Sequence, residues 1–135
     1  MSYVLAMPVP VSSPGKPTIL VVEDEILIRI ELADELRDQG YAVIEAADAN
    51  EALSILRSNA GVDVLVTDIR MPRGTMDGLA LAGRVRTEYP AMKVLITSAH
   101  MSRENGRELF DGFFPKPCNV IGLIGHIEGL LDRRN

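Results

Sequence analysis

The chain has 135 residues, of which 47% are hydrophobic and 24% charged, with a formal net charge of −5 and a single cysteine. This composition is typical of one soluble globular domain, and the length is too short for two. The acidic balance without clustered Lys and Arg argues against a nucleic-acid surface, and one cysteine excludes an internal disulfide and a cysteine-based zinc site. This cysteine usage leads us to expect a cytoplasmic protein. No apolar run reaches the roughly 20 residues that cross a bilayer.

The first segment, residues 1–16, is expected to be a mobile tail. It lacks the basic start of a targeting sequence, and Pro8, Pro10 and Pro14 interrupt its apolar run. We therefore place a single folded domain in residues 17–135.

From residue 18 onward, short β-branched runs alternate with longer helical stretches. Alternating units of this length predict an α/β fold, in which a doubly wound parallel sheet has helices on both faces. The segment between the last two strands has scarcely any helical apolar stripe, so residues 99–112 are expected to form a loop or at most a short helical turn. Strands are predicted at residues 18–23, 41–46, 62–68, 93–99 and 111–117, and helices at 26–40, 49–59, 78–89 and 119–134.

The first predicted helix carries two sets of apolar residues. Ile28, Leu32 and Leu36 recur at helical spacing and are expected to face the sheet. Ile26 and Ile30 then lie on another part of the helix surface, where they would suit a helical partner. The alternative is one wide core stripe that includes both sets.

Polar side chains stand where the predicted strands end. In open α/β sheets the ligand lies beyond the carboxyl ends of the strands, so these residues are expected to converge at one edge. Crowded carboxylates repel one another unless a cation lies among them, and Mg²⁺ prefers oxygen ligands. An acid cluster alone is more often a helix N-cap or a solvated edge. The residues concerned are Glu23, Asp24 and Glu25 after the first strand, Asp68 after the third, Thr97 and Ser98 after the fourth, and Lys116 after the fifth.

The combination of these groups suits phosphoryl transfer. An aspartate such as Asp68 can act as a nucleophile towards phosphorus, and Lys116, Ser98 and a metal ion would stabilise the oxygens of the transferred group. The presence of all these groups in order favours such a site over the plainer interpretation.

The motifs VVEDE, TDIRMP, MDG, ITSA and PKP, in that order, resemble those of the response-regulator receiver family of two-component signalling. The resemblance covers residues 18–133. It implies a flavodoxin-like five-stranded sheet with strand order 2-1-3-4-5, in which the fourth helix of the family is here short or missing. It also suggests a stand-alone receiver, since the residues after Lys116 read as one helix.

Matched position by position, the resemblance assigns a metal site and a phosphoacceptor. Glu23, Asp24, Asp68 and the backbone carbonyl of Arg70 match the groups that hold Mg²⁺ in the family. Asp68 matches the aspartate that is phosphorylated. Arg70 and His100 each stand two positions after a site residue, where family members place side chains at the rim of the pocket.

The other matched residues act on the phosphoryl group or respond to it. Lys116 matches the family's catalytic lysine, and its bond to Pro117 matches the family's cis peptide bond. Ser98 matches the hydroxyl residue that contacts the phosphoryl group, with Thr97 facing the other way. Ser98 and Phe113 together match the pair that switches on phosphorylation, although Phe113 could also be an ordinary core residue.

The resemblance implies a phosphoacceptor that receives a phosphoryl group from a histidine kinase or a histidine phosphotransfer protein and then binds a downstream protein. Such a chain is no metabolic enzyme and catalyses only its own phosphorylation and dephosphorylation. It is expected to be a monomer or weak dimer that binds neither nucleic acid nor membrane. One alternative is a pseudo-receiver that interacts without phosphorylation. Another is a small phosphohydrolase, but Arg70 occupies the place where that chemistry needs a second carboxylate.

Three further residues have plain interpretations. Cys118 is expected to be a small buried core residue. His100 and His126 are expected to face solvent, because neither has an acid or a cysteine at metal-ligand spacing.

Overall fold

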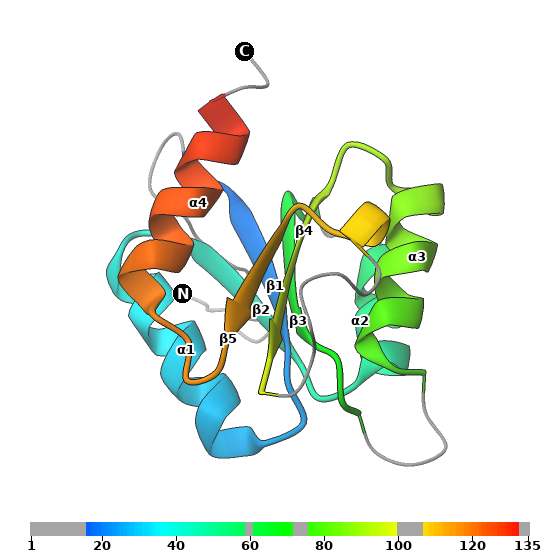
Figure 1. The fold of residues 1–135 in the computed structure, drawn as a ribbon, viewed down its shortest axis with the longest axis horizontal. Coiled ribbons are helices and arrows are strands. Elements are labelled where there is room, and N and C mark those ends of the chain that lie inside the picture. Colours follow the sequence, from blue (N-terminus) through cyan, green and yellow to red (C-terminus); the bar gives the residue numbers. More distant parts are fainter. Residues whose placement is uncertain (1–15, 59–60, 72–75, 100–106, 133–135) are drawn as a thin grey trace, which may run out of the picture.

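The protein is described here from a computed structural model, which covers residues 16–58, 61–71, 76–99 and 107–132 (Figure 1). Strands and helices alternate along the chain as predicted, and their bounds lie within two residues of the predicted ones. The elements are β1 (Thr18–Val22), α1 (Ile26–Asp38), β2 (Ala42–Ala46), α2 (Ala49–Arg57), β3 (Val64–Asp68), α3 (Gly78–Glu88), β4 (Lys93–Ser98), the 3₁₀ turn η1 (Arg107–Leu109), β5 (Gly112–Pro115) and α4 (Val120–Asp132).

The five strands form one parallel sheet in the order β2-β1-β3-β4-β5. Helices α1 and α4 cover one face and α2 and α3 the other (Figure 1). This arrangement confirms the predicted flavodoxin-like fold. Because β1 and β3 are neighbours in the middle of the sheet and all strands run the same way, the chain segments that leave their carboxyl ends start side by side.

Apolar side chains fill both sides of the sheet because successive residues of a strand point to opposite faces. Ile19 and Val21 of β1 belong to the core under α1 and α4, whereas Leu20 and Val22 belong to the core under α2 and α3. All four are almost completely buried. A strand with two buried faces reads as a continuous apolar run, which is the pattern that predicted a parallel sheet.

Helix α1 differs from its predicted orientation at one residue. Leu32 and Leu36 are buried as expected, but Ile28 is 38% exposed, so its assignment to the core was wrong. Ile28 lies in the first turn of α1, where the helix borders an open cavity rather than the sheet. Ile26 and Ile30 are exposed, as expected for the second apolar set.

Between β4 and β5, the only helical structure in the residues that the structure describes is the turn η1 (Arg107–Leu109), which agrees with the prediction of at most a short helical turn. Leu109 packs against the core under α3. Residues 100–106, which include His100, lie outside the described residues, as does the predicted tail up to residue 15. Among the helices that are described, none has the length and apolar character needed to span a membrane.

Candidate functional site

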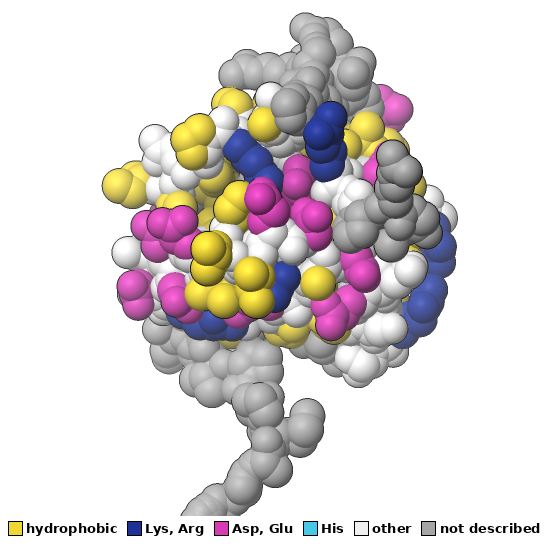
Figure 2. Space-filling view, turned by 90° about the horizontal axis from the view of Figure 1, so that it is seen from below, with side chains coloured by type: hydrophobic (Ala, Val, Ile, Leu, Met, Phe, Trp, Pro, Cys, Tyr) yellow, Lys and Arg dark blue, Asp and Glu magenta, His cyan; other side chains and the backbone are white. Residues whose placement is uncertain are grey.

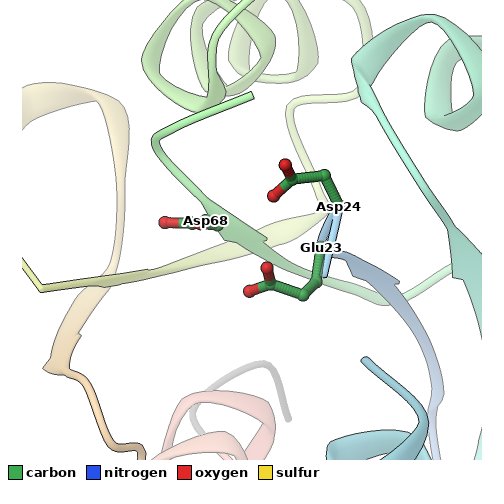
Figure 3. A group of neighbouring side chains, drawn as sticks. All are labelled: Glu23, Asp24 and Asp68. Atoms are coloured by element: carbon green, nitrogen blue, oxygen red, sulfur yellow. The ribbon is translucent and has the colours of Figure 1, made fainter. Parts of the chain in front are cut away.

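Three carboxylates meet at the carboxyl edge of the sheet. Glu23 and Asp24 follow β1 directly, and Asp68 is the last residue of β3. One oxygen from each lies within 4.8 Å of the others, and Figure 3 shows the three side chains next to one another. Glu23 and Asp68 are buried, whereas Asp24 is exposed. The structure therefore brings together three of the four acids that the sequence placed at strand ends, and this oxygen-only donor set fits a hard divalent cation such as Mg²⁺.

Lys116 lies between two of these acids. Its Nζ is 2.7 Å from Oε1 of Glu23 and 3.0 Å from Oδ2 of Asp68. Burial alone would lower the pKa of Lys116, but the hydrogen bonds to Glu23 and Asp68 outweigh it and raise the pKa above the ordinary 10.5. Burial raises the pKa of Glu23 above 4.5, and the hydrogen bond from Lys116 opposes that rise. Lys116 is therefore a cation at neutral pH, shared by the two carboxylates.

Backbone groups fix the orientation of the two buried acids. The N–H of Glu25 donates to Oε2 of Glu23 at 3.1 Å, and the N–H of Ile69 donates to Oδ1 of Asp68 at 2.7 Å. The hydroxyl of Thr67 donates to the backbone carbonyl of Asp68 at 2.8 Å. Each of these acids thus has one carboxylate oxygen held by the backbone and the other by Lys116.

Asp68 opens into a cavity of about 360 Å³ at this edge. Ser98, which is buried, and Arg70, which is exposed, both line this cavity. Figure 2 views this end of the molecule and shows acidic side chains gathered near the middle of the face, with Lys and Arg side chains beside them. The cavity is lined by Asp24, Glu25, Asp68, Arg70, Ser98, Ala99 and Lys116.

Thr97 and Phe113 lie away from this cavity. Thr97 lines a second cavity, in agreement with the prediction that it faces away from Ser98. Phe113 is half-buried and packs at a centroid distance of 6.4 Å from Phe110, against the core under α2 and α3. This packing suits either a core residue or a switch. The Lys116–Pro117 peptide bond is cis, as the resemblance implied.

The second cavity, of about 440 Å³, lies between α1 and the segment that follows β5. No motif of the sequence predicts this cavity, although Pro117, Cys118 and Val120 form an apolar cluster directly after Lys116. Cys118 is half-buried on its wall rather than fully buried, and burial followed by the charge of Glu35 raises the pKa of its thiol to about 11. The lining residues are Glu23, Ile28, Glu31, Leu32, Glu35, Thr97, Lys116, Pro117, Cys118 and Val120.

His126 is exposed, as predicted, but it is not free of contacts. Its Nε2 lies 3.1 Å from the backbone carbonyl oxygen of Asp111, and its ring meets that of Phe114 edge-on at 5.6 Å. His126 therefore helps to attach α4 to β5 and lies apart from the acidic cavity.

Gly78, the first residue of α3, determines how closely the chain can pass the end of β3. A Cβ at this position would overlap the backbone carbonyl oxygen of Asp68 and lie 2.8 Å from Cα of Ile69, and neither atom can move as a side chain can. The N–H of Gly78 also donates to the carbonyl of Ile69 at 2.8 Å. We expect Gly78→Ala to lower the free energy of unfolding by about 3 kcal/mol, at the upper end of ordinary overpacking, measured by urea denaturation.

A second glycine of the same helix provides the control. The nearest atom to a Cβ at Gly83 is Cδ2 of Leu109 at 3.9 Å, which is an ordinary contact. Gly83→Ala is expected to be neutral or to stabilise by roughly 0.5–1 kcal/mol, because alanine loses less backbone entropy in a helix. Equal effects at positions 78 and 83 would contradict the close approach at Gly78.

Comparison with known proteins gives a consistent result. Residues 19–128 match the family model of the response regulator receiver domain. The chain is 34% identical over 126 residues to the sensor kinase CckA of Brucella abortus, covering 90% of this chain and 13% of CckA. It is 32% identical over 120 residues to the transcriptional regulatory protein PdtaR of Mycobacterium tuberculosis, covering 85% of this chain and 57% of PdtaR. The chain thus spans only part of the length of these two relatives.

Solved structures agree with the sequence relatives. The response regulator TrrA of Thermotoga maritima, in complex with Mg²⁺-BeF, superposes with a TM-score of 0.76 at 30% identity, covering 84% of this chain and 98% of TrrA. Since the family model matches most of the chain and the fold agrees, the chain belongs to the response regulator receiver domain family.

Proposed function

We propose that the chain is a phosphoacceptor of a two-component phosphorelay, in which Asp68 receives a phosphoryl group from a phosphohistidine. The observation that carries this proposal is the position of the Asp68 carboxylate at the end of a central strand, in a cavity that also presents Ser98 and Lys116. The donor would be a sensor histidine kinase or a histidine phosphotransfer protein. The phosphorylated chain would bind a downstream protein, and both partners would be met in the cytoplasm.

The acidic cluster would hold Mg²⁺ in this proposal. The ligands would be the carboxylates of Glu23, Asp24 and Asp68 and the backbone carbonyl of Arg70, and the Mg²⁺-BeF complex of TrrA supports this choice of metal. When bound, the ion supplies positive charge that balances the crowded acids and the oxygens of the incoming phosphoryl group.

The side chains of this protein would carry the transfer itself. A carboxylate oxygen of Asp68 attacks the phosphorus, a P–O bond forms, and the P–N bond to the histidine breaks with its electron pair left on the ring nitrogen. Lys116 and the hydroxyl of Ser98 contact oxygens of the transferred group. Attack of water on phosphorus later regenerates Asp68 and releases inorganic phosphate, and Arg70 at the rim can influence access of that water.

Two other functions are less well supported. A pseudo-receiver would not need Asp68, Ser98 and Lys116 together at one cavity. A phosphohydrolase acting on other molecules would need an acid two positions after Asp68, where the chain has Arg70. Movement of Ser98 and Phe113 on phosphorylation is the proposed link to partner binding.

Incubation with acetyl phosphate, with Mg²⁺ or with a chelator, tests the proposal by intact mass. We expect the gain of one phosphoryl group with Mg²⁺ and no gain with the chelator. Absence of labelling under both conditions would favour the pseudo-receiver, and equal labelling under both would exclude the Mg²⁺ requirement.

The exposed apolar residues at the start of α1 are proposed to contact the phosphohistidine donor. Ile26, Leu27 and Ile30 are 57%, 79% and 40% exposed, beside the carboxyl edge of the sheet. Ile30→Glu is expected to slow transfer from a phosphohistidine protein by about tenfold, equivalent to 1.4 kcal/mol, because a carboxylate replaces a side chain that is desolvated in the complex. Labelling by acetyl phosphate should not change.

Ser54→Glu is the matched control for this prediction. It adds the same charge at an exposed position of α2, on the other side of the sheet, and should leave both reactions unchanged. If Ile30→Glu slowed both reactions equally, misfolding would explain the effect, and docking through α1 would be rejected if neither reaction changed.

A further inference from the structure

The backbone of Glu23 has a partner on α1 that no motif of the sequence indicates. NH1 of Arg29 donates to the carbonyl oxygen of Glu23 at 2.9 Å, and the N–H of Glu23 donates to the carbonyl of Ala46 in β2 at 3.1 Å. Both backbone polar groups of Glu23 therefore have partners: the N–H is bonded to β2 and the carbonyl to Arg29. Glu23 is the residue at which the chain leaves β1 and enters the acidic cluster.

Arg29 is itself fixed by a carboxylate on β2. Its Nε lies 3.2 Å from Oε1 of Glu45, while NH1 of Arg37 lies 3.0 Å from Oε2 of the same residue. The side chain of Arg29 is only 15% exposed and that of Glu45 24%, so this pair is largely shielded from solvent. An arginine held at Nε has its planar guanidinium aimed in one direction, which lysine cannot reproduce.

We propose that Arg29 is a positioning residue for the metal site, acting through the backbone of Glu23. This inference rests on the proposed function, because it concerns the affinity for Mg²⁺. The hydrogen bond from Arg29 to the Glu23 carbonyl fixes the backbone that carries the Glu23 and Asp24 side chains. Groups that orient metal ligands in this way contribute strongly to metal affinity.

The charge of Arg29 acts in the opposite sense to its hydrogen bond. A cation near three carboxylates would by itself weaken Mg²⁺ binding, so its removal would strengthen binding. However, Arg29 is paired with Glu45, which balances most of that charge at 3.2 Å. In Arg29→Ala, the loss of ligand positioning should therefore weaken Mg²⁺ binding more than the loss of charge repulsion strengthens it. Whether the affinity falls or rises tests the proposal.

The test measures the Mg²⁺ dissociation constant of the unphosphorylated protein by calorimetry, together with the thermal unfolding midpoint without metal. Arg29→Ala is expected to raise the dissociation constant about tenfold, the lower end of the usual effect of such partners. Arg37→Ala is the matched control. It removes the same charge, a Glu45 ion pair and a hydrogen bond to a backbone carbonyl, in this case that of Val43 at 3.0 Å.

Arg37→Ala should lower the unfolding midpoint in a similar way to Arg29→Ala and leave Mg²⁺ affinity within about twofold of the native value. Arg29→Lys keeps the charge without the planar fork and is expected to weaken binding too, so it decides the matter if Arg29→Ala does not fold.

If the native chain binds Mg²⁺ and folded Arg29 variants bind it equally well or more tightly, this inference is wrong, but the proposed metal site is not affected. Equal weakening by Arg37→Ala would also overturn it, because the effect would then come from the ion-pair network. Failure of the native chain to bind Mg²⁺ would instead overturn the proposed metal site, and this inference with it.

Discussion

Asp68→Asn is expected to take up no phosphoryl group from acetyl phosphate under Mg²⁺ conditions that label the native chain. The asparagine is nearly isosteric, and its amide oxygen can still accept the N–H of Ile69, which is 2.7 Å from the native Oδ1. What is lost is the carboxylate nucleophile, and an amide does not replace it. Circular dichroism should therefore show a folded protein, while intact mass shows no labelling.

Asp34→Asn makes the same change on the exposed surface of α1 and should be labelled like the native chain. Labelling of Asp68→Asn at the native rate would show that another residue is the acceptor. Both variants lose one negative charge, so a difference in labelling between Asp68→Asn and Asp34→Asn cannot come from the change in net charge.

Lys116→Ala is expected to slow labelling by about 10²- to 10³-fold, the usual cost of removing one group that stabilises developing charge on oxygen. The native Nζ contacts Asp68 at 3.0 Å and is therefore close to where a transferred phosphoryl group would lie. Mg²⁺ binding should persist, because the ligand set does not include the lysine. Lys93→Ala, at the opposite end of the sheet, should be labelled at the native rate.

The stability of Lys116→Ala should also depend on pH. Burial raises the pKa of Glu23 above 4.5 even in the native chain, where the hydrogen bond from Lys116 opposes the rise. Lys116→Ala deletes that hydrogen bond, so the pKa of Glu23 should rise further. A raised carboxyl pKa stabilises the folded state below the unfolded pKa, and this contribution is lost as the pH rises through the folded pKa. Urea denaturation should thus show a smaller difference from the native chain near pH 4 than near pH 7.

The fold and the acidic cluster could be predicted because both depend on local patterns. Continuous apolar runs predict the strands, and the rule that parallel strands end at one edge is sufficient to place Glu23, Asp68 and Lys116 close together. The role of Gly78 is less visible, since a glycine at the start of a helix has several explanations. The overlap that a Cβ at position 78 would make with the Asp68 carbonyl depends on tertiary distance, which no local pattern reveals.

Other features could not be read from the sequence because they depend on where elements end in space. Ile28 repeats with Leu32 at helical spacing, yet it extends past the covered part of the sheet and stays 38% exposed. The contact of Arg29 with Glu23 uses a backbone carbonyl, which every residue possesses and no motif marks. The cavity beside Cys118 arises from two segments far apart along the chain.

The N–H of Lys116 donates to the carbonyl of Ser98, the last residue of β4, at 3.1 Å, which extends the pairing of the two strands one residue beyond the end of β5. The two residues proposed to hold the phosphoryl group are therefore joined through the main chain, and Phe113 is part of the same edge strand, paired with Ile96. We expect a displacement of Ser98 or Lys116 to be transmitted to β5 through the backbone hydrogen bonds between the two strands. Phe113 would then respond to a phosphoryl group in the cavity through the backbone hydrogen bonds that join β4 and β5.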